Sequence, residues 1–151
     1  MAVIGGSCRF GLWFVYVWWS ENTIYHIRFA TTGIPGQVPQ PVRKFCTGKP
    51  EDFSSLSSIA TMSGSLYSRI YRTVQDIPYG ATATYGEIGQ KTGTNPRVVG
   101  QAMARNPTPL IVPCHRVVSA HGIGGFSPSV DIKEALLLME KKAVKRTEKI
   151  R

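Results

Sequence analysis

Hydrophobic positions follow two different periods along the chain. Residues 10–29 are rich in aromatic and β-branched side chains, and a polar turn at Ser20-Glu21-Asn22 divides them. After this turn the positions alternate, with Tyr25, Ile27 and Phe29 on one face, which predicts a β-hairpin. Beyond residue 65 the apolar positions recur at helical spacing. The pattern therefore predicts a β-rich N-terminal part followed by a helical C-terminal part.

The connection between the two parts is rich in residues that interrupt regular structure. Prolines at positions 35, 39 and 41 mark a loop, and residues 42–46 can form one or two helical turns ended by Gly48. The Ser-rich stretch 54–64 is typical of a linker. We therefore divide the chain into an N-terminal β-rich domain with its linker, residues 1–60, and a C-terminal domain, residues 61–151. A unit of about 60 residues is marginally stable alone, so the first domain should pack against the second.

Helix signals are clear in the second part. Apolar residues at i, i+4 and i+8 predict a helix through Leu66, Ile70 and Val74. Thr84, followed by Glu87 three residues later, forms a capping box for the next helix. Asn95 can cap a further helix from Pro96 to Arg105. Two short helices joined by a Gly-containing turn predict a helix-turn-helix.

A final helix follows the Gly-rich loop 119–125. Ser127 or Ser129 can cap it. Its apolar stripe consists of Ile132, Ala135, Leu136, Met139 and Ala143. Glu140 lies at the edge of this stripe, so its carboxylate either reaches outward or is held by a partner inside. The basic tail, residues 141–151, is expected to be a solvated or frayed end.

The composition is that of a folded protein with an uneven positive charge. Of 151 residues, 42% are hydrophobic and 18% are charged, which excludes a disordered chain. Residues 1–60 contain five Lys/Arg against three Asp/Glu, a net +2, and residues 61–151 contain thirteen against six, a net +7. The second part is therefore where a polyanion would bind.

Three cysteines at irregular spacing do not make a disulfide framework, which favours a reducing compartment. Cys8 and Cys46 could pair, but nothing in their spacing favours it. A metal site would need Cys8, His26 and Cys46 without any CxxC or HxxxH spacing, so we expect no metal. The apolar run 10–19 is about half as long as a membrane span and lacks the flanks of a cleavable leader. We expect a cytoplasmic protein, nuclear in a eukaryote.

The densest chemistry lies in residues 106–118. A short apolar run there stops at Pro113, immediately before Cys114-His115-Arg116. A thiol is nucleophilic only as the thiolate, and adjacent imidazole and guanidinium groups favour that form. The alternative is a buried core cysteine. If Glu140 converges on this site, its carboxylate would orient the imidazole toward the thiol proton. Neighbours on an extended strand point opposite ways, so we expect a bridging water between Cys114 and His115.

With its surroundings, this stretch resembles the active-site signature of the O6-alkylguanine-DNA alkyltransferases, whose centre is Pro-Cys-His-Arg-Val, residues 113–117 here. The resemblance covers roughly residues 78–141, with Asn106-Pro107 upstream, a helix-turn-helix before the signature and a Glu-bearing helix after it. It implies an α/β (α+β) fold with a small ribonuclease-H-like β-rich N-terminal domain and a helical C-terminal domain.

The resemblance also implies the activity of a methylated-DNA–[protein]-cysteine S-methyltransferase. Such a protein flips O6-alkylguanine out of double-stranded DNA and takes the alkyl group irreversibly on its own cysteine, once per molecule. The chemistry requires no cofactor, and we expect a monomer.

Individual positions match the catalytic part of the family's pattern. Cys114 is similar to the alkyl acceptor, His115 to its water-linked base and Glu140 to the partner of that base. Asn106 resembles the hinge asparagine that ties the helix-turn-helix to the active-site segment. Tyr85 resembles the tyrosine that donates a proton or hydrogen bond to N3 of the departing guanine, whose anion needs stabilisation.

Other positions match the family's contacts with DNA and with the base. Arg97 resembles the arginine that fills the gap left by the flipped base, which offsets part of the unstacking cost. Small residues after it allow a partner backbone to approach. The expected DNA-binding set is Arg97, Gly100, Ala102, Arg105 and Ser127, and the expected substrate pocket contains Val117, Phe126 and Ser127. The family's helix-turn-helix enters the minor groove, where sequence readout is poor, which suits a protein that scans any sequence. Arg116 is expected to be a structural ion-pair residue.

The sequence departs from the family at a few positions. Phe126 stands where many relatives have a tyrosine that lines the alkyl pocket, and Ser119 stands where some have another cysteine. The segment between Tyr85 and Arg97 is shorter than in some relatives. The N-terminal unit matches only in general pattern and shows no nuclease carboxylate cluster.

Three other functions stay open at this point. Alkyltransferase-like relatives bind the lesion without repairing it, but they have a tryptophan at the position of Cys114. A cysteine hydrolase would also use Cys, His and an acid, yet it would need neither the +7 part nor a helix-turn-helix. A transcription regulator would use the helix-turn-helix alone, and the regulatory domain fused to it in some relatives is not recognisable here.

Overall fold

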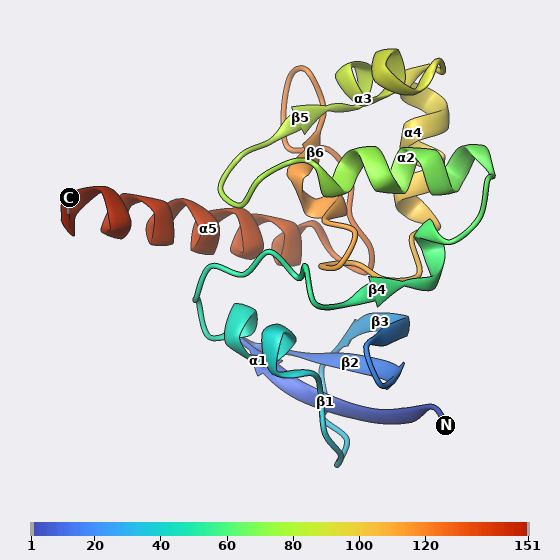
Figure 1. Ribbon diagram of the computed structural model, residues 1–151. Coiled ribbons are helices and arrows are strands. Elements are labelled where there is room, and N and C mark those ends of the chain that lie inside the picture. Colours follow the sequence, from blue (N-terminus) through green and yellow to red (C-terminus); the bar gives the residue numbers. More distant parts are fainter. Residues whose placement is uncertain (1, 151) are drawn as a thin grey trace.

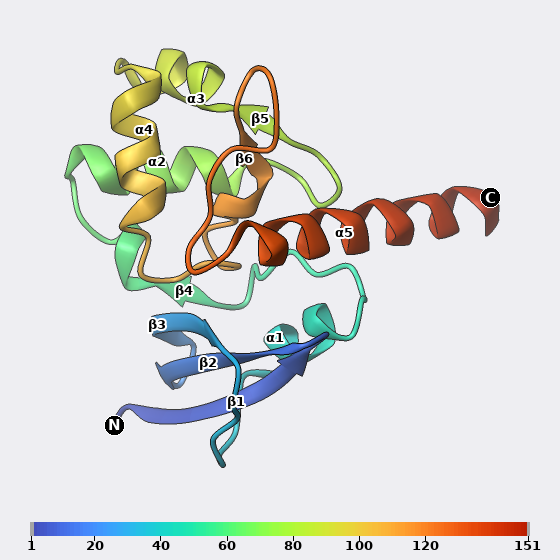
Figure 2. The same ribbon diagram turned by 180° about the vertical axis from the view of Figure 1, so that it is seen from behind.

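The computed structural model describes residues 2–150. A sheet lies at one end of the molecule, shorter helices lie at the other, and a long C-terminal helix runs between them (Figure 1). Seen from behind, that helix projects beyond the body (Figure 2). The strands are β1 (Ile4–Phe10), β2 (Trp13–Ser20), β3 (Thr23–Ala30), β4 (Ser57–Ser58), β5 (Ala83–Thr84) and β6 (Val117–Val118). The helices are α1 (Gln40–Cys46), α2 (Leu66–Gln75), α3 (Tyr85–Thr92), α4 (Pro96–Ala104) and α5 (Val130–Ile150), with 3-10 turns η1 (Ile59–Thr61) and η2 (Cys114–Arg116). The predicted mixed fold class is confirmed.

The N-terminal sheet contains a strand that the hydrophobic pattern did not predict. β1 pairs antiparallel with β2, β2 pairs antiparallel with β3, and β4 runs parallel to β3. The predicted two-stranded hairpin was therefore incomplete. Gly5 and Gly6 obscure β1 in the sequence, because they lack side chains to give a pattern. A loop crosses directly over this strand, and a Cβ on Gly6 would lie 2.4 Å from the carbonyl oxygen of Gln37.

A β-bulge changes the alternation in β3. Trp18 pairs with His26 but Trp19 pairs with Ile24, so Tyr25 is the extra residue. Ile24 and Ile27 are both buried, whereas Tyr25 is 38% exposed. The expectation that Tyr25 shares a face with Ile27 was wrong, because an inserted residue shifts the side chains before it to the opposite face.

The expected linker is partly ordered, and it connects the sheet to the segment that carries the cysteine signature. The hydroxyls of Ser58 and Thr108 form a buried hydrogen bond of 2.6 Å. The N–H of Ile27 donates to the carbonyl of Pro107 at 2.8 Å. The buried face of the sheet shares one apolar core with Leu110, Ile111, Ile132 and Leu136. The division of the chain at residue 60 stays a prediction, but the two parts share this core.

Local capping signals start the two helices of the helix-turn-helix as expected. Thr84 and Glu87 form the capping box of α3, and the Asn95 side chain accepts from the N–H of Val98 at the start of α4. Gly93 ends α3 in the left-handed conformation, with φ at 73°. A second apolar core under these helices contains Ile70, Val74, Ile88 and Val99.

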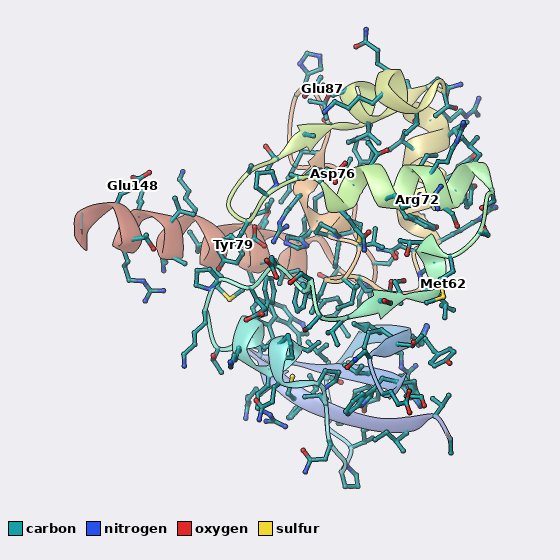
Figure 3. The ribbon with its side chains drawn as sticks, in the orientation of Figure 1. Met62, Arg72, Asp76, Tyr79, Glu87 and Glu148 are labelled. Atoms are coloured by element: carbon teal, nitrogen blue, oxygen red, sulfur yellow. The ribbon has the colours of Figure 1, made fainter. Side chains whose placement is uncertain are left out.

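Helix α5 is longer than expected. It runs from Val130 to Ile150, so most of the basic tail continues the helix, and Arg151 lies outside the described residues. Glu148 lies on the projecting end (Figure 3). The predicted stripe is buried at Ile132, Leu136 and Ala143. No helix within residues 2–150 is both long and apolar enough to cross a membrane.

Two cysteines lie in the core of the N-terminal part. Cys8 on β1 and Cys46 at the end of α1 are buried free thiols that are hydrogen-bonded to each other. His26 is exposed on β3, so it does not join them. Across the part of the chain that the structure describes, no three His, Cys, Asp or Glu side chains are grouped so as to hold a metal ion.

Candidate active site

Asn106 organises the turn that presents the candidate nucleophile. Its side-chain amide donates to the Val112 carbonyl at 2.9 Å, and its side-chain oxygen accepts from the Thr108 N–H at 3.0 Å. Within this turn Leu110 has a positive φ of 77°, which is unfavourable for a non-glycine residue. The segment is buried as predicted, but it is a tight turn that leads directly into η2.

Cys114 and His115 both lie in the 3-10 turn η2. The expectation that they occupy an extended strand and point opposite ways was therefore wrong. Asn106 closes the preceding turn through its side chain, and Arg116 donates its N–H to the carbonyl of Pro113 at 2.9 Å. These hydrogen bonds are made by backbone and amide groups. The pattern of hydrophobic residues therefore did not indicate them.

Cys114 faces a cavity of about 290 Å³. The residue is only 8% exposed. Burial raises the pKa of the Cys114 thiol to about 11, although a hydrogen bond from Asn106 and the charge of Lys133 act in the opposite direction. The thiol is therefore protonated at neutral pH in the free protein and needs a base. The other residues that line the cavity are Tyr85, Gly100, Met103, Ala104, Asn106, Pro109, Gly125, Phe126 and Ser127.

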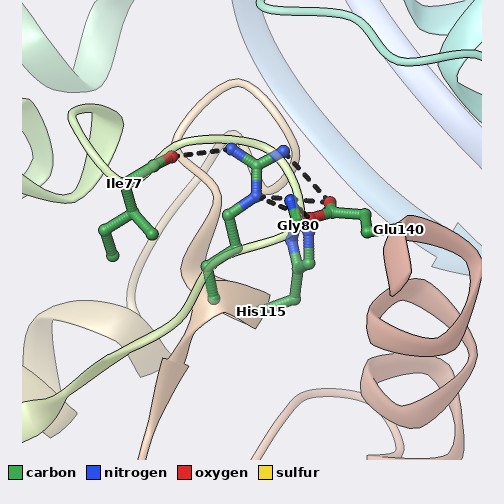
Figure 4. Close-up of polar contacts among 5 residues, drawn as sticks. Ile77, Gly80, His115 and Glu140 are labelled. Carbon is green, nitrogen blue, oxygen red and sulfur yellow. Dashed lines mark hydrogen bonds and ion pairs between the residues drawn. The ribbon is translucent and has the colours of Figure 1, made fainter. Parts of the chain in front are cut away.

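His115 and Glu140 form a buried pair beside η2. Nε2 of His115 lies 2.5 Å from Oε2 of Glu140, and both side chains are 1% exposed. The same carboxylate accepts from the Arg116 guanidinium at 2.9 and 3.0 Å and from the Gly80 N–H at 2.9 Å (Figure 4). Burial opposes its charge, but the hydrogen bonds and charges of His115 and Arg116 outweigh burial and lower the pKa of Glu140 to about 2. The carboxylate is therefore ionised at neutral pH.

The ionised carboxylate fixes the tautomer of His115. Burial lowers the pKa of His115 despite the opposing effect of Glu140, so the imidazole is neutral at pH 7. A neutral ring beside a carboxylate places its single N–H on Nε2, which leaves Nδ1 as an acceptor. Nδ1 is buried and has no hydrogen-bond partner among residues 2–150. It is the ring nitrogen that can take a proton.

Arg116 forms the structural ion pair that the sequence predicted. Besides Glu140, its guanidinium donates to the carbonyl of Ile77 at 2.9 Å and lies 5.5 Å from the centre of the Tyr79 ring. These contacts satisfy the cation of a residue that is only 6% exposed. Arg116 therefore balances the charge of the buried carboxylate.

Tyr85 lies beside Cys114 in the cavity. Burial raises the pKa of the Tyr85 phenol, the proximity of Cys114 raises it further, and a hydrogen bond with the backbone of Gly125 lowers it. The loop after β6 packs closely on the hydroxyl, because a Cβ on Gly124 would lie 2.9 Å from it. The phenol is protonated at neutral pH and can donate a hydrogen bond into the cavity.

Lys133 is a site residue that the sequence reasoning missed. It is fully buried, and its ammonium donates to the carbonyls of Val117 at 2.6 Å and Gly125 at 3.1 Å. The ammonium also lies 5.7 Å from the centre of the Tyr85 ring. Burial lowers the pKa of Lys133 to about 8. Lys133 lies two helical turns before Glu140, so both residues are on one face of α5. This spacing could have indicated Lys133 as a site residue.

The expected DNA-binding residues divide into exposed and buried ones. Arg97, on the first turn of α4, and Arg105, at its end, are exposed, and Arg105 donates to the Tyr67 hydroxyl at 3.0 Å. Gly100 lines the cavity on the same helix. Ala102 is fully buried against the core, so its expected contact with DNA is corrected. Packing against the core explains the small size of this residue.

The expected substrate pocket is also only partly formed as predicted. Phe126 and Ser127 line the cavity, and Phe126 packs edge-on against Phe29 of β3, with 5.8 Å between the ring centres. Val117 is fully buried in the core below α2 and α4 and is not among the residues that line the cavity. Its carbonyl is occupied by Lys133.

A helix-turn-helix beside a buried cysteine, with a His–Glu pair behind that cysteine, defines a DNA-binding protein with a thiol that can be activated. Residues 65–142 match the family described as 6-O-methylguanine DNA methyltransferase, DNA binding domain, and the chain belongs to this family. The predicted family membership is confirmed.

Relatives and solved structures agree with this membership. The chain is 43% identical over 103 residues to the methylated-DNA–protein-cysteine methyltransferase of Methanopyrus kandleri, a match that covers 68% of this chain and 78% of that protein. The O6-methylguanine-DNA methyltransferase of Pyrococcus kodakaraensis is 26% identical with a TM-score of 0.70, over 92% of this chain and 99% of that one. The Mycobacterium tuberculosis O6-methylguanine methyltransferase is 24% identical and has the same fold, with a TM-score of 0.73 over 94% of both chains.

Proposed function

We propose that this protein repairs double-stranded DNA by transferring the alkyl group of O6-alkylguanine irreversibly to its own Cys114. The observation that carries the proposal is the position of this thiol. It faces a cavity that is lined by α4 of the helix-turn-helix on one side and by loop residues 125–127 on the other. A base flipped out of DNA bound at α4 can enter this cavity. The relatives named as methylated-DNA–protein-cysteine methyltransferases support the same activity.

In this proposal His115 activates the thiol. The S–H proton of Cys114 passes to Nδ1 of His115, directly or through water, and Glu140 stabilises the resulting imidazolium. The sulfur attacks the alkyl carbon, an S–C bond forms, and the bond from that carbon to guanine O6 breaks. Guanine leaves with the electron pair, and the product is a thioether. Because a thioether has no route back to the thiol, each molecule acts once.

Tyr85 stabilises the leaving group in this mechanism. Negative charge develops on the purine as the C–O bond breaks, and a donor aimed at ring atom N3 lowers the barrier. The Tyr85 hydroxyl lines the cavity beside Cys114 and is protonated at neutral pH, since burial raises its pKa. Lys133 lies against the Tyr85 ring, where its charge favours donation. Asn106 holds the nucleophile's turn in place.

DNA binding is expected to rest on the positive charge of the second part and on α4. Phosphate contacts release counterions, so affinity should fall as salt rises. The Mycobacterium tuberculosis protein, which shares this fold, has been solved in complex with DNA. Arg97 is exposed at the N-terminal turn of α4 and is therefore able to enter the base stack when a guanine is extruded.

Arg97→Ala should slow repair of a duplex substrate roughly tenfold, because an inserted side chain offsets part of a flipping cost of a few kcal/mol. Its reaction with free O6-alkylguanine base should stay near the wild-type rate. Single-turnover rates on the two substrates measure this difference. Arg9→Ala, which removes the same charge from an exposed position on β1, is the matched control and should change neither rate. Equal losses of Arg97→Ala on both substrates would exclude its flipping role.

Gly100→Leu should block the substrate and leave the fold intact. A Cβ at Gly100 meets no atom within 4 Å beyond its chain neighbours and the nearby backbone of its own helix, and this residue lines the cavity. The added side chain would occupy the entrance, whereas replacing a helical glycine raises stability by about 0.5–1 kcal/mol. We expect a transfer rate at least about tenfold lower with an undiminished urea midpoint. Gln101→Leu adds the same side chain to the exposed side of α4 and should leave transfer unchanged. A normal transfer rate in Gly100→Leu would mean that the substrate does not enter the cavity beside α4.

Two other functions make different predictions. A lesion sensor would bind O6-alkylguanine DNA and leave the alkyl group in place, and a cysteine hydrolase would turn over more than once.

A cytoplasmic location, or a nuclear one in a eukaryote, fits the three free cysteines. We further propose a monomer that needs no cofactor, because thiol, base and leaving-group donor all come from this chain.

A further inference from the structure

Helix α1 brings a side chain of the N-terminal part against the proposed base. Phe45 is fully buried. Its ring meets the His115 imidazole edge-on, with 6.1 Å between ring centres and 63° between planes. It meets the Tyr79 ring in the same way, at 5.9 Å and 80°. Phe45 lies outside the region that resembles the family signature, so no motif pointed to it.

These contacts are part of a closed cycle that includes the buried His–Glu pair. Phe45 packs on Tyr79, the Arg116 guanidinium lies over Tyr79, and Arg116 binds Glu140, which binds His115. The contact of His115 with Phe45 completes the cycle. Phe53 supports Phe45 from the N-terminal side, with 5.4 Å between the ring centres.

We propose that Phe45 is a positioning residue for alkyl transfer, whose aromatic ring fixes the plane of the His115 imidazole and excludes water from it. This inference rests on the proposed function. It gives the N-terminal part a direct place in the chemistry, because α1 completes the surroundings of a base that belongs to the second part.

The geometry explains why the Glu140 contact alone is not sufficient. Rotation of a histidine ring about its Cβ–Cγ bond has a broad energy profile. Nε2 lies closer to this axis than Nδ1 does, so its hydrogen bond to Glu140 restrains the ring plane weakly. Nδ1 lies farther from the axis and moves more with each rotation. An aromatic ring packed against the imidazole therefore limits this movement of Nδ1.

The same packing sets the electrostatics of the base. Burial is the largest effect on the pKa of His115 and lowers it; Glu140 raises it, while Arg116 and Lys133 lower it. Tyr79 lies against Phe45 and Arg116, and its phenol stays neutral because burial raises its pKa. Loss of the Phe45 ring would admit water and reduce the burial effect. The pKa of His115 would then rise toward its ordinary value.

The test measures the His115 titration and the transfer rate in the full-length chain. In Phe45→Leu, which keeps an apolar side chain, the His115 midpoint followed by NMR of its ring nitrogens should move to higher pH. The acid limb of the transfer rate should move by the same amount. At the alkaline plateau the rate should fall about tenfold, because the ring is less well aligned.

Phe10→Leu is the matched control, because Phe10 is buried in the same core and stacks on Trp13. It should leave the His115 midpoint unchanged. In the wild type, nuclear Overhauser contacts should connect the rings of Phe45 and His115, a readout that needs no folded variant. Absence of these contacts, or an unshifted His115 midpoint in Phe45→Leu, would overturn the proposal. Because the NMR titration does not require alkyl transfer, it fails or succeeds separately from the proposed function.

Discussion

Cys114→Ala is expected to abolish alkyl transfer completely while duplex binding is retained. The variant removes the sulfur that forms the new S–C bond, and no second thiol is found among the described residues that line the cavity. The exposed face of α4, which would contact DNA, is unchanged. Transfer of a labelled methyl group from a duplex to protein, with gel-shift titration of the same duplex, measures both properties.

The control for Cys114→Ala is Cys8→Ala, which removes another buried thiol from the N-terminal core. It should retain full stoichiometric transfer. Labelled Cys114→Ala protein would exclude Cys114 as the acceptor. Loss of duplex binding together with transfer, in a variant that is still folded, would instead mean that the thiol contributes to DNA binding itself.

Glu140→Gln should cause the largest loss of stability among single substitutions in the site. The variant keeps the shape of the side chain but leaves the buried Arg116 cation without its carboxylate partner. Breaking a buried ion pair by removing one partner costs about 3–5 kcal/mol. Urea unfolding at pH 7 measures this free energy. Glu148→Gln, on the exposed projecting end of the same helix (Figure 3), should change it by less than about 0.5 kcal/mol.

The stability effect of Glu140 should also depend on pH in a defined direction. In the folded protein the pKa of Glu140 is lowered from an ordinary value of 4.5 to about 2. A carboxylate with a depressed folded pKa contributes stability that is fully present above about 4.5 and is lost as the pH falls toward 2. The difference in free energy of unfolding between wild type and Glu140→Gln should therefore become smaller as the pH falls through this range. A difference that stays constant from about pH 6 to about pH 3 would contradict the ionised state of Glu140.

Local signals account for the parts of the fold that the sequence predicted well. The capping box of Thr84 and Glu87 and the cap at Asn95 each depend on atoms within a few residues. These capping interactions therefore start a helix whatever the rest of the fold is. The apolar stripe of α5 is equally local, since one helix face suffices to define it. These elements are the ones that build the helix-turn-helix and orient Glu140.

The features that were missed depend on contacts between distant segments. Strand β1 is hidden because Gly6 accommodates the backbone at Gln37, and the bulge at Tyr25 is visible only in the pairing of β2 with β3. Burying the amine of Lys133 costs free energy, so the sequence alone predicts an exposed residue. Its hydrogen bonds to the carbonyls of Val117 and Gly125 offset this cost. Such positions are determined by the assembled molecule and leave little periodic signal.

The candidate site was predicted from two kinds of information. Spacing in the last helix indicated a carboxylate at the edge of a buried face, which is where Glu140 lies, 1% exposed. The Cys-His-Arg triplet indicated thiol chemistry, and the family resemblance supplied the roles. The contact of Phe45 with His115 could not be predicted, because it depends on how the two parts of the chain pack. The 3-10 turn at η2 was missed because its backbone hydrogen bonds leave no hydrophobic pattern.

The most direct test of the central claim is the intact mass of the protein after incubation with a duplex that contains one O6-methylguanine, followed by peptide mapping. The proposed mechanism predicts a gain of one methyl group on Cys114 that saturates at one per molecule. Tight binding of the lesion without any change in mass would contradict the mechanism and identify a sensor. No change in mass and no binding would leave the cysteine hydrolase as the remaining function for this site.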